Sequence, residues 1–486
     1  MSKAKNTKYF INVAIVIVIM VFFRFIPTFG SMTTLGMTVL GIFIGALYGW
    51  ITCDMIWPSI LALVMLGLSD YGGDNSVSTV LTTAVSNSNV QLMLWLLVFS
   101  ALLTTTGVSR WLVSKLVNSK FCIGHPWRFS VIICFAVYLC ASFGAGFAAM
   151  LICWDLVYSI SEQVGYTKKD KWPKMMVVSI VVFNVVGVCI LPFMSGTVSS
   201  MSYLATASEN AYTYGSAIYL QYLIFSLLFS VCTLIIFVLC CRFIIRPDMS
   251  KLSNKIEMSS AEKLTTRQKI AIGALIALFV LAILPGCLPT CWLKTFLNNI
   301  GTTAITLFIV GFVTVLRDKE GKPFFTFRDL ANGGIMWPMM FMVSTAIVFG
   351  SALSSADSGF TATLTTAFSP ILENTSPYLF AIVIALFTMI LTNIINNGVA
   401  VAIMVPIMYP FVSTLGINPF MMTSVIIFCA NCGLLLPCAS PAGAMMHSNK
   451  EWINTGEIVR YSLLGLGSIL LTAIVVGIPV GGIIFG

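Results

Sequence analysis

The stretch "TNIINNGVAVAIMVPI", residues 392–407, decides the fold, because it places three asparagines and a glycine inside a strongly apolar part of the chain. An amide side chain without a hydrogen-bond partner costs several kcal/mol in hydrocarbon. Asn393, Asn396 and Asn397 therefore need partners from the protein or from water. The pattern predicts a polar break between two helices that are embedded in a membrane.

The composition of the whole chain is that of a polytopic membrane protein. Of its 486 residues, 58% are hydrophobic and only 9% are charged, and the mean hydropathy is +0.98. Apolar runs of about 17–25 residues, long enough to cross about 30 Å of hydrocarbon as helix, recur from residue 9 to residue 482. We expect one all-α membrane domain. Its first run lacks a small-residue cleavage site, which indicates a retained helix.

The net charge of +9 indicates membrane topology rather than binding to nucleic acid. Of the 26 Lys and Arg residues, 24 lie in the N-terminal segment, in predicted cytoplasmic loops or at adjoining helix ends. These loops are 108–128, 162–174, 242–269, 317–328 and the turn at Lys450. Because cytoplasmic loops are enriched in Lys and Arg, we expect a multi-pass cell-membrane protein with a cytoplasmic N-terminus and an outer C-terminus. The expected partners are the lipid bilayer and a small anionic substrate, and no nucleic acid.

The 14 cysteines and two histidines show no metal-ligand spacing. His125 and His447 are far apart in the chain and near predicted cytoplasmic helix ends, so we expect no bound metal cofactor. Cys287 and Cys291 flank a predicted outer turn, "PGCLPTCW", and the sequence leaves open whether they form a disulfide.

Three weak internal matches occur in the same order in the two halves of the chain. The matched pairs are "SALLTTTG" (100–107) with "SALSSADSG" (351–359), "SFGAGFAAMLI" (142–152) with "NNGVAVAIMVP" (396–406), and "LPFMSG" (191–196) with "LPCASP" (436–441). Combined with the charge pattern, they predict two repeats of opposite orientation. The expected parts are an N-terminal helix (1–34), a first half (35–244), a cytoplasmic linker (245–269) and a second half (270–486).

Opposite orientation requires each half to contain a hairpin that enters and leaves on one side of the membrane. We assign these re-entrant hairpins to 127–163 and 377–416. Each is followed by a span with proline and glycine at its centre, 173–207 and 419–445, which predicts a broken helix. Two hairpin tips facing two broken helices are typical of a secondary transporter.

The predicted spans contain almost no cation that could pair with an anionic substrate; Arg24 in the first helix is the exception. An anion would instead bind to amides, hydroxyls and helix N-termini. Each helix N-terminus carries about half a positive charge. Carbonyl oxygens freed at the helix breaks would suit Na⁺ as a coupling ion.

The sequence also resembles a known family, the divalent-anion/sodium symporters (DASS) of the ion-transporter superfamily, as a divergent member. The resemblance rests on "LGMTVLGIFIGALYGWITCDMIWPSILALVMLGL" (35–68), "WLLVFSALLTTTGVSRWL" (95–112) and "FCANCGLLLPCASPAGAMM" (428–446). It implies about eleven transmembrane helices plus two re-entrant hairpins, a homodimer, and elevator-like movement of a transport domain against a scaffold domain. The substrates it implies are di- and tricarboxylates or sulfate, usually coupled to Na⁺ and in some members exchanged.

The family carries Ser-Asn-Thr at both hairpin tips, and this chain keeps only part of that pattern. Its second tip reads Asn396, Asn397 and Gly398, and its first reads Ser142, Phe143 and Gly144. The resemblance assigns substrate binding to both tips and to the breaks, namely Ser142, Phe143, Gly144, Ser195, Asn396, Asn397, Gly398, Ser440 and Pro441. It assigns Na⁺ binding to Ser142, Gly144, Asn393, Asn397 and Ser440. The bulky Phe143 is expected to change the shape of the substrate site.

We therefore expect a symporter for a small organic anion, coupled to Na⁺. An anion exchanger or a proton-coupled carrier of a monocarboxylate or inorganic anion remains open. A membrane-embedded enzyme would need acid, base or nucleophilic groups that converge within the spans, and the sequence has few such residues there. We therefore expect no enzymatic activity.

Overall fold

The computed structural model describes residues 3–69, 71, 73, 76–117, 125–253, 264–289, 291–360, 362–363, 366, 375–395, 397–436, 439–449 and 451–486. These residues form helices and contain no β-strand, apart from an isolated bridge between Arg317 and Pro323. The elements up to the middle of the chain are α1 (Lys3–Phe22), η1 (Phe23–Phe25), α2 (Thr34–Thr52), α3 (Ile56–Gly67), α4 (Ser76–Ser86), α5 (Ser88–Thr106), α6 (Val108–Val117), α7 (Pro126–Ser142), α8 (Gly146–Gln163), α9 (Lys171–Gly187), α10 (Ser195–Ala207) and α11 (Ser216–Cys240). The remaining elements are η3 (Cys241–Ile245), η4 (Ser250–Ser253), α12 (Thr266–Cys287), α13 (Trp292–Val315), α14 (Phe327–Gly334), α15 (Trp337–Ser354), η5 (Ala356–Ser358), α17 (Pro377–Ile394), α18 (Asn397–Thr414), α19 (Pro419–Ala430), α20 (Pro441–Ser448), α21 (Thr455–Thr472), η6 (Ala473–Gly477) and α22 (Ile478–Phe485).

The helix lengths confirm an all-α polytopic membrane protein. Among the described residues, eight helices are long and apolar enough to cross a bilayer, or up to ten if each of two bent pairs counts as one span. One bent pair is α14 with α15, which meet at 69°. The shorter apolar helices are α3, α7 and α19. Helix α7 lies in the first predicted hairpin, and α19 lies in the second predicted broken span.

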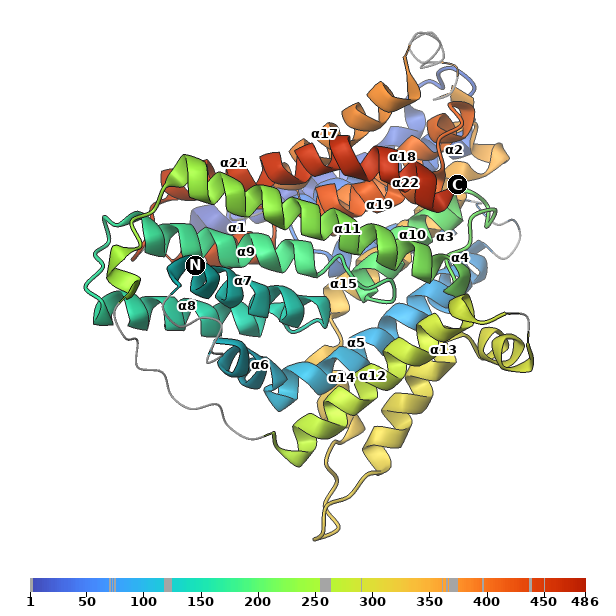
Figure 1. The fold of residues 1–486 in the computed structure, drawn as a ribbon. Helices are drawn as coiled ribbons and strands as arrows, with labels where there is room; N and C mark the ends of the chain where they lie inside the picture. Colours follow the sequence, from blue (N-terminus) through green and yellow to red (C-terminus); the bar gives the residue numbers. More distant parts are fainter. Residues whose placement is uncertain are drawn as a thin grey trace.

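By their contacts the helices fall into two groups, and Figure 1 shows α9, α11 and α21 of the first group above α5, α12, α13 and α14 of the second. In one group, α9, α11 and α21 lie side by side and cover α7 and α8 on one flank and α17 to α19 on the other. In the other group, α5 packs against α12, α13 and α14, and α2 and α3 pack against α15. Large exposed apolar side chains, such as Phe10, Leu227 and Ile235, lie on the outer helices, as expected for surfaces that face lipid.

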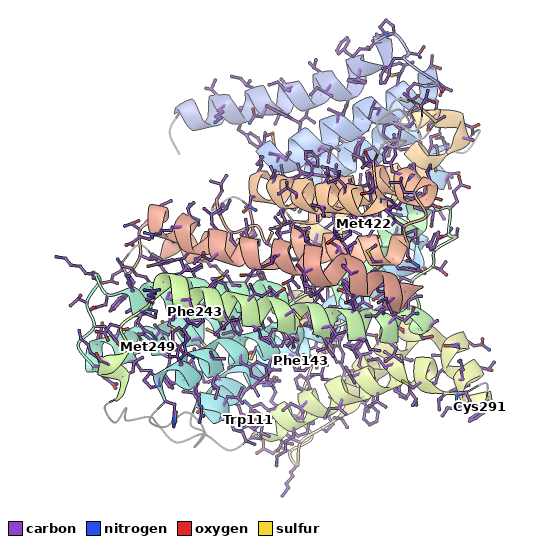
Figure 2. All side chains as sticks on the ribbon, turned by 45° about the horizontal axis from the view of Figure 1, so that its top comes forward. Trp111, Phe143, Phe243, Met249, Cys291 and Met422 are labelled. Carbon is purple, nitrogen blue, oxygen red and sulfur yellow. The ribbon has the colours of Figure 1, made fainter. Side chains whose placement is uncertain are left out.

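Helices from both halves of the chain share one aromatic core. The rings of Phe229 in α11 and Phe428 in α19 stack with their centroids 4.2 Å apart. Close packing needs small residues: a Cβ on Gly477 would lie 2.8 Å from the Phe229 ring, and one on Gly481 would lie 2.6 Å from Met421 Cγ. Figure 2 shows how side chains fill the interior, with Phe143 in its middle and Cys291 at its edge.

Each predicted hairpin range contains two helices joined by a short break. Helices α7 and α8 are connected by Phe143–Ala145, where Gly144 has φ +79°. Helices α17 and α18 are separated by residues 395 and 396, and Asn396 lies outside the described residues. The bases of the two hairpins lie on opposite sides of the molecule (Figure 1): Gly165 follows α8 and accepts a hydrogen bond from Lys251, whereas Asn418 follows α18 and donates to the carbonyl oxygen of Phe485.

The structure differs from the sequence prediction at several element boundaries. The expected linker 245–269 overlaps α12, because a capping box between Thr265 and Gln268 starts that helix at Thr266. The helix breaks span 188–194 and 431–440, so both begin before the prolines that predicted them. Pro437 itself lies outside the described residues. The assignment of the halves to inverted repeats stays a prediction.

A cluster of ion pairs and stacked rings connects loops from the two halves of the chain, on the side that the sequence predicts to be cytoplasmic. Lys168 pairs with Glu451 at 3.2 Å and Lys174 pairs with Glu457 at 2.6 Å. The Tyr158 and Trp452 rings stack beside these pairs, with centroids 5.3 Å apart. Contacts of this kind hold the base of the first hairpin to the end of the second broken helix.

Candidate functional site

The second hairpin tip packs directly into the second helix break. Asn397 is the first residue of α18, and Thr392 Oγ donates a hydrogen bond to its Oδ1 at 2.9 Å. A Cβ on Gly433 in the break would lie 2.6 Å from that same oxygen and 3.0 Å from the Thr392 carbonyl oxygen. Only glycine fits this position, so the amide of Asn397 lies against bare backbone at the centre of the break.

Asn393 connects the same hairpin to the break through two hydrogen bonds and makes a third within its own helix. It is 5% exposed, and its Oδ1 accepts from the backbone N–H groups of Leu434 at 3.0 Å and Leu435 at 2.9 Å. Its Nδ2 donates to the Met389 carbonyl oxygen at 2.8 Å. Since an amide oxygen has two lone pairs, both are in use here. These bonds favour a role for Asn393 in holding the break open, and its predicted role as a Na⁺ ligand stays untested.

Ser440 closes the break and begins α20. Its Oγ donates to the Gly433 carbonyl oxygen at 2.5 Å and accepts from the Gly443 N–H at 2.9 Å, which makes it the N-cap of that helix. Pro441 occupies the first turn of α20 with its side chain exposed. Ser440 therefore retains one lone pair for a ligand, and it is buried close to Asn397 and Gly433.

The first hairpin tip is more apolar, as the sequence predicted. Ser142 is buried and its Oγ donates to the Tyr138 carbonyl oxygen at 2.9 Å within the same helix. Phe143 is half-buried, and a Cβ on Gly144 would lie 3.1 Å from Met194 Cε in the first break. The half-buried Ser195 follows Met194 as the first residue of α10. This tip therefore packs on the first break through a methionine side chain rather than through amides.

Asn184 in α9 is the residue that sequence reasoning missed. It is 3% exposed, and its Oδ1 is buried without a hydrogen-bond partner among the described residues. A Cβ on Gly146, the first residue of α8, would lie only 2.0 Å from this oxygen. The only signal in the sequence was a single asparagine in the apolar run "VVSIVVFNVVGV" (177–188).

The two halves thus place an asparagine amide against a glycine in the same setting, but with the partners exchanged. In the second half the hairpin provides Asn397 and the break provides Gly433. In the first half the broken span provides Asn184 and the hairpin provides Gly146. Asn184 therefore supplies an amide oxygen to the first tip, where Phe143 stands in place of the asparagine that the resemblance implies.

Electrostatics at this site come from backbone and amide dipoles. Among the described residues, no Asp, Glu, Lys or Arg side chain is fully buried, and no three His, Cys, Asp or Glu side chains are grouped as metal ligands. The N-termini of α8 and α10 have no side-chain cap hydrogen bond. Their positive ends lie at the first tip and break, while α18 and α20 begin at the second. Helices α10 and α18 pack against each other, so the two halves meet here.

Of the predicted site residues, the structure brings Asn393, Asn397 and Ser440 together at the second tip and Ser142, Phe143 and Gly144 together at the first. Asn396 lies outside the described residues, and Gly398 is half-buried in the first turn of α18. Cys287 and Cys291 are exposed free thiols away from this site.

Comparison with known proteins supports the helical membrane fold. The family model described as "Sodium:sulfate symporter transmembrane region" matches residues 3–482. Among solved structures, the chain is similar to the YdaH transporter of Alcanivorax borkumensis, which has an unusual topology. The TM-score is 0.58 at 12% identity, over 85% of this chain and 89% of that one, so the likeness concerns the fold alone. No curated protein matches the chain in sequence.

Proposed function

Since the chain belongs to the sodium:sulfate symporter transmembrane family, which confirms the resemblance to divalent-anion/sodium symporters, we propose that it couples the movement of a small organic anion to Na⁺. The substrate class is a di- or tricarboxylate or a similarly sized anion. The mechanism is alternating access, in which the two hairpin tips and helix breaks move together as one transport domain.

The observation that carries the proposal is the pair of tip-and-break cradles. Each presents an asparagine amide, a glycine and the start of a helix, with no buried charged side chain among the described residues. Such a site neutralises an anion through dipoles and releases it readily, because no direct ion pair has to be broken. Na⁺ would bind to oxygen ligands at the same cradles, where Ser440 and the backbone of the breaks provide them.

Uptake into proteoliposomes tests the coupling. We expect radiolabelled succinate or citrate to accumulate under an inward Na⁺ gradient and not when choline replaces Na⁺. Undiminished uptake in choline would exclude Na⁺ symport. Sulfate belongs in the same panel because the family description includes it.

Two asparagine variants test the cradles. Asn397→Ala should abolish uptake at unchanged expression, while the matched control Asn418→Ala, whose amide binds the C-terminal carbonyl groups, should retain it. Asn184→Ala should weaken substrate or Na⁺ binding about 5–150-fold, the equivalent of a lost bond of about 1–3 kcal/mol. Because Asn184 Oδ1 has no partner among the described residues, this change should not lower the free energy of unfolding. Loss of stability with full affinity would identify Asn184 as a structural residue.

Proton coupling is the second candidate, and one observation favours it. His447 in the last turn of α20 is buried, and its Nε2 has no hydrogen-bond partner among the described residues. A histidine in such a place can exchange a proton during transport. Uptake driven by a pH gradient without Na⁺, and lost in His447→Gln, would support this candidate.

We further propose a homodimer in the cell membrane with the N-terminus in the cytoplasm. The orientation is testable with Cys287 and Cys291, which are exposed in the turn between α12 and α13. A membrane-impermeant maleimide added to intact cells should label them, and the variant lacking both should not be labelled at this turn. Labelling only after the cells are opened would reverse the orientation.

A further inference from the structure

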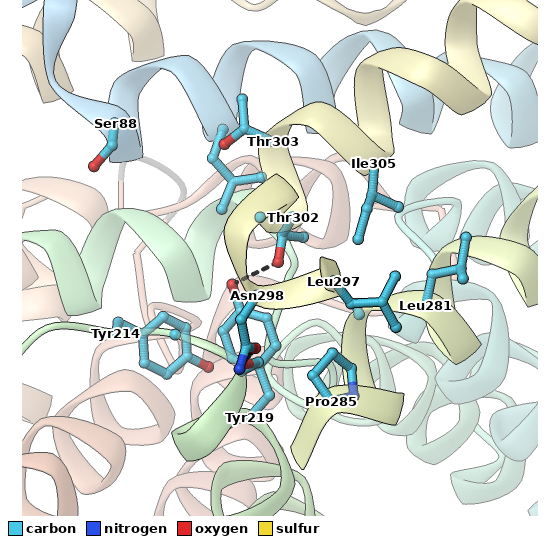
Figure 3. A pocket seen from close by; sticks show the side chains of 15 residues that line it. Ser88, Tyr214, Tyr219, Leu281, Pro285, Leu297, Asn298, Thr302, Thr303 and Ile305 are labelled. Carbon is cyan, nitrogen blue, oxygen red and sulfur yellow. Dashed lines mark hydrogen bonds between the residues drawn. The ribbon is translucent and has the colours of Figure 1, made fainter. Parts of the chain in front are cut away.

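A polar cavity of about 290 Å³ lies between α5, α11, α12 and α13, apart from the hairpin tips. Small-molecule sites generally measure about 300–1,000 Å³, so this cavity suits a small ligand. Figure 3 shows side chains of α11 and α13 that line it. The hydroxyl and amide groups around it belong to Ser88, Ser216, Tyr219, Asn298, Thr302 and Thr303.

A break in α13 opens on this cavity. Gly301 has φ 71° and ψ 161° between two helical segments, and no atom lies within 4 Å of a Cβ built on it. Glycine is therefore required here by backbone conformation and not by crowding. Non-helical backbone at membrane depth is tolerated where it lines a polar cavity, since its amides and carbonyls then find partners.

Three helical segments begin at the cavity wall. Helix α5 starts at Ser88, α11 starts at Ser216, and the second segment of α13 starts after Gly301. The start of α11 has no side-chain cap hydrogen bond. Each such end carries about half a positive charge, and none of the lining residues is acidic or basic. The potential inside the cavity therefore favours an anion.

Two side chains add available hydrogen-bond donors. Tyr219 is 2% exposed and its Oη accepts from Thr302 Oγ at 3.3 Å, so its own O–H has no acceptor among the described residues (Figure 3). Ser216 Oγ donates to Asn298 Oδ1 at 2.7 Å, which leaves the Asn298 amide nitrogen available to donate. We propose that this cavity binds a small oxyanion, such as a carboxylate, sulfate or phosphate group, at a site separate from the tips.

Tyr214 connects the cavity to the transport site. It lines the cavity, and its hydroxyl donates to the Pro192 carbonyl oxygen at 2.9 Å in the first helix break. An anion in the cavity therefore contacts a side chain that holds this break. The cavity holds an anion on the side predicted to be outside, before the anion reaches the hairpin tips. This role rests on the proposed transport function, whereas anion binding itself does not.

Thiol protection tests the proposal. The purified protein carries Asn397→Ala, which disables the tip site, and Thr303→Cys, which places a thiol on the cavity wall. N-Ethylmaleimide, an uncharged reagent, labels this thiol, and peptide mass spectrometry follows the rate. Sulfate or succinate, exchanged for chloride at constant ionic strength, should slow labelling about tenfold at about ten times the dissociation constant.

The matched control is Thr314→Cys, on the same helix but outside the cavity, where the rate should not change. Tyr219→Phe removes the O–H that has no acceptor among the described residues and should reduce the protection at position 303. An unchanged rate at position 303, or equal slowing at both positions, would overturn the proposal. Protection by phosphatidylglycerol micelles but not by sulfate or succinate would assign the cavity to a lipid headgroup instead. Protection at position 303, together with a wild-type protein that takes up none of the tested anions into proteoliposomes, would retain the cavity site and reject the transport proposal.

Discussion

Replacing Gly146 with alanine tests the contact between the first hairpin and Asn184. The new Cβ would lie 2.0 Å from Asn184 Oδ1 and 2.8 Å from Ala141 Cβ. Since a carbon–oxygen contact needs about 3.3 Å, the amide or the start of α8 must move by more than 1 Å. Such overpacking costs about 1–3 kcal/mol, and the better helix propensity of alanine returns at most about 1 kcal/mol. We therefore expect Gly146→Ala to lower the free energy of unfolding by about 1–2 kcal/mol.

Unfolding by SDS titration in mixed micelles, followed by tryptophan fluorescence, measures this change. The matched control is Gly196→Ala in the first turn of α10, where no atom lies within 4 Å of the added Cβ. At that position alanine should be neutral or should stabilise the protein by up to about 1 kcal/mol.

The double variant decides whether Asn184 is the cause. Asn184→Ala removes the oxygen that the new methyl group would meet, so part of the loss should return in Gly146→Ala/Asn184→Ala. The two sites should couple by about 0.5–2 kcal/mol. Strict additivity of the two single changes, or wild-type stability of Gly146→Ala, would refute the contact that Asn184 is proposed to make with the hairpin tip.

Three further predictions concern the bonds that hold the breaks and loops. Asn393→Leu leaves the buried N–H groups of Leu434 and Leu435 without their acceptor. It should lower the free energy of unfolding by about 2–6 kcal/mol, at about 1–3 kcal/mol for each group. Asn393→Asp keeps the acceptor and should lower the free energy of unfolding much less, and equal losses in the two variants would contradict the assignment. Lys174→Met should lower the free energy of unfolding more than Lys168→Met, because an exposed ion pair contributes little. The side chains of Lys174 and Glu457 are 12% and 31% exposed, whereas those of Lys168 and Glu451 are 62% and 73% exposed. SDS titration of both variants compares the two losses. A hydrogen bond from the Thr167 backbone N–H lowers the pKa of Asp170 below its usual range. The ionised carboxylate therefore stabilises the fold fully above the unfolded pKa of about 3.9. This stabilisation is lost as the pH falls through the lower pKa of the folded state. Asp170→Asn should therefore lower the unfolding midpoint at pH 7 but little at the acid end of a pH series, and a difference that is constant with pH would contradict this.

Sequence reasoning was sufficient for the class of the fold and for the location of the two breaks between helices, after Ser142 and after Ile394. Apolar runs set the helices, and the clusters at Ser142–Gly146 and Asn393–Gly398 interrupt them, so the periodicity and its breaks are both local signals. The structure places α7 and α8, and α17 and α18, on either side of these clusters. The family resemblance is confirmed as well.

The bonding of the site could not be predicted, because it depends on contacts between distant segments. Whether Asn393 faces a ligand or the backbone of the break is decided by residues about forty positions later in the chain. Asn184 gained meaning only from Gly146, on a different helix. The Gly301 break left a weak signal, "NNIGTTAIT" (298–306), because one glycine in an apolar helix usually marks packing rather than a break.

The ion pairs between the loops of the two halves have a mechanical consequence. Lys174 lies in the first turn of α9, the helix that carries Asn184, and Glu457 lies in the first turn of α21. Tyr158 and Trp452 brace the same junction. The Lys174–Glu457 pair therefore joins the start of the helix that carries Asn184 to the start of α21 in the other half of the chain, so α21 resists a displacement of α9.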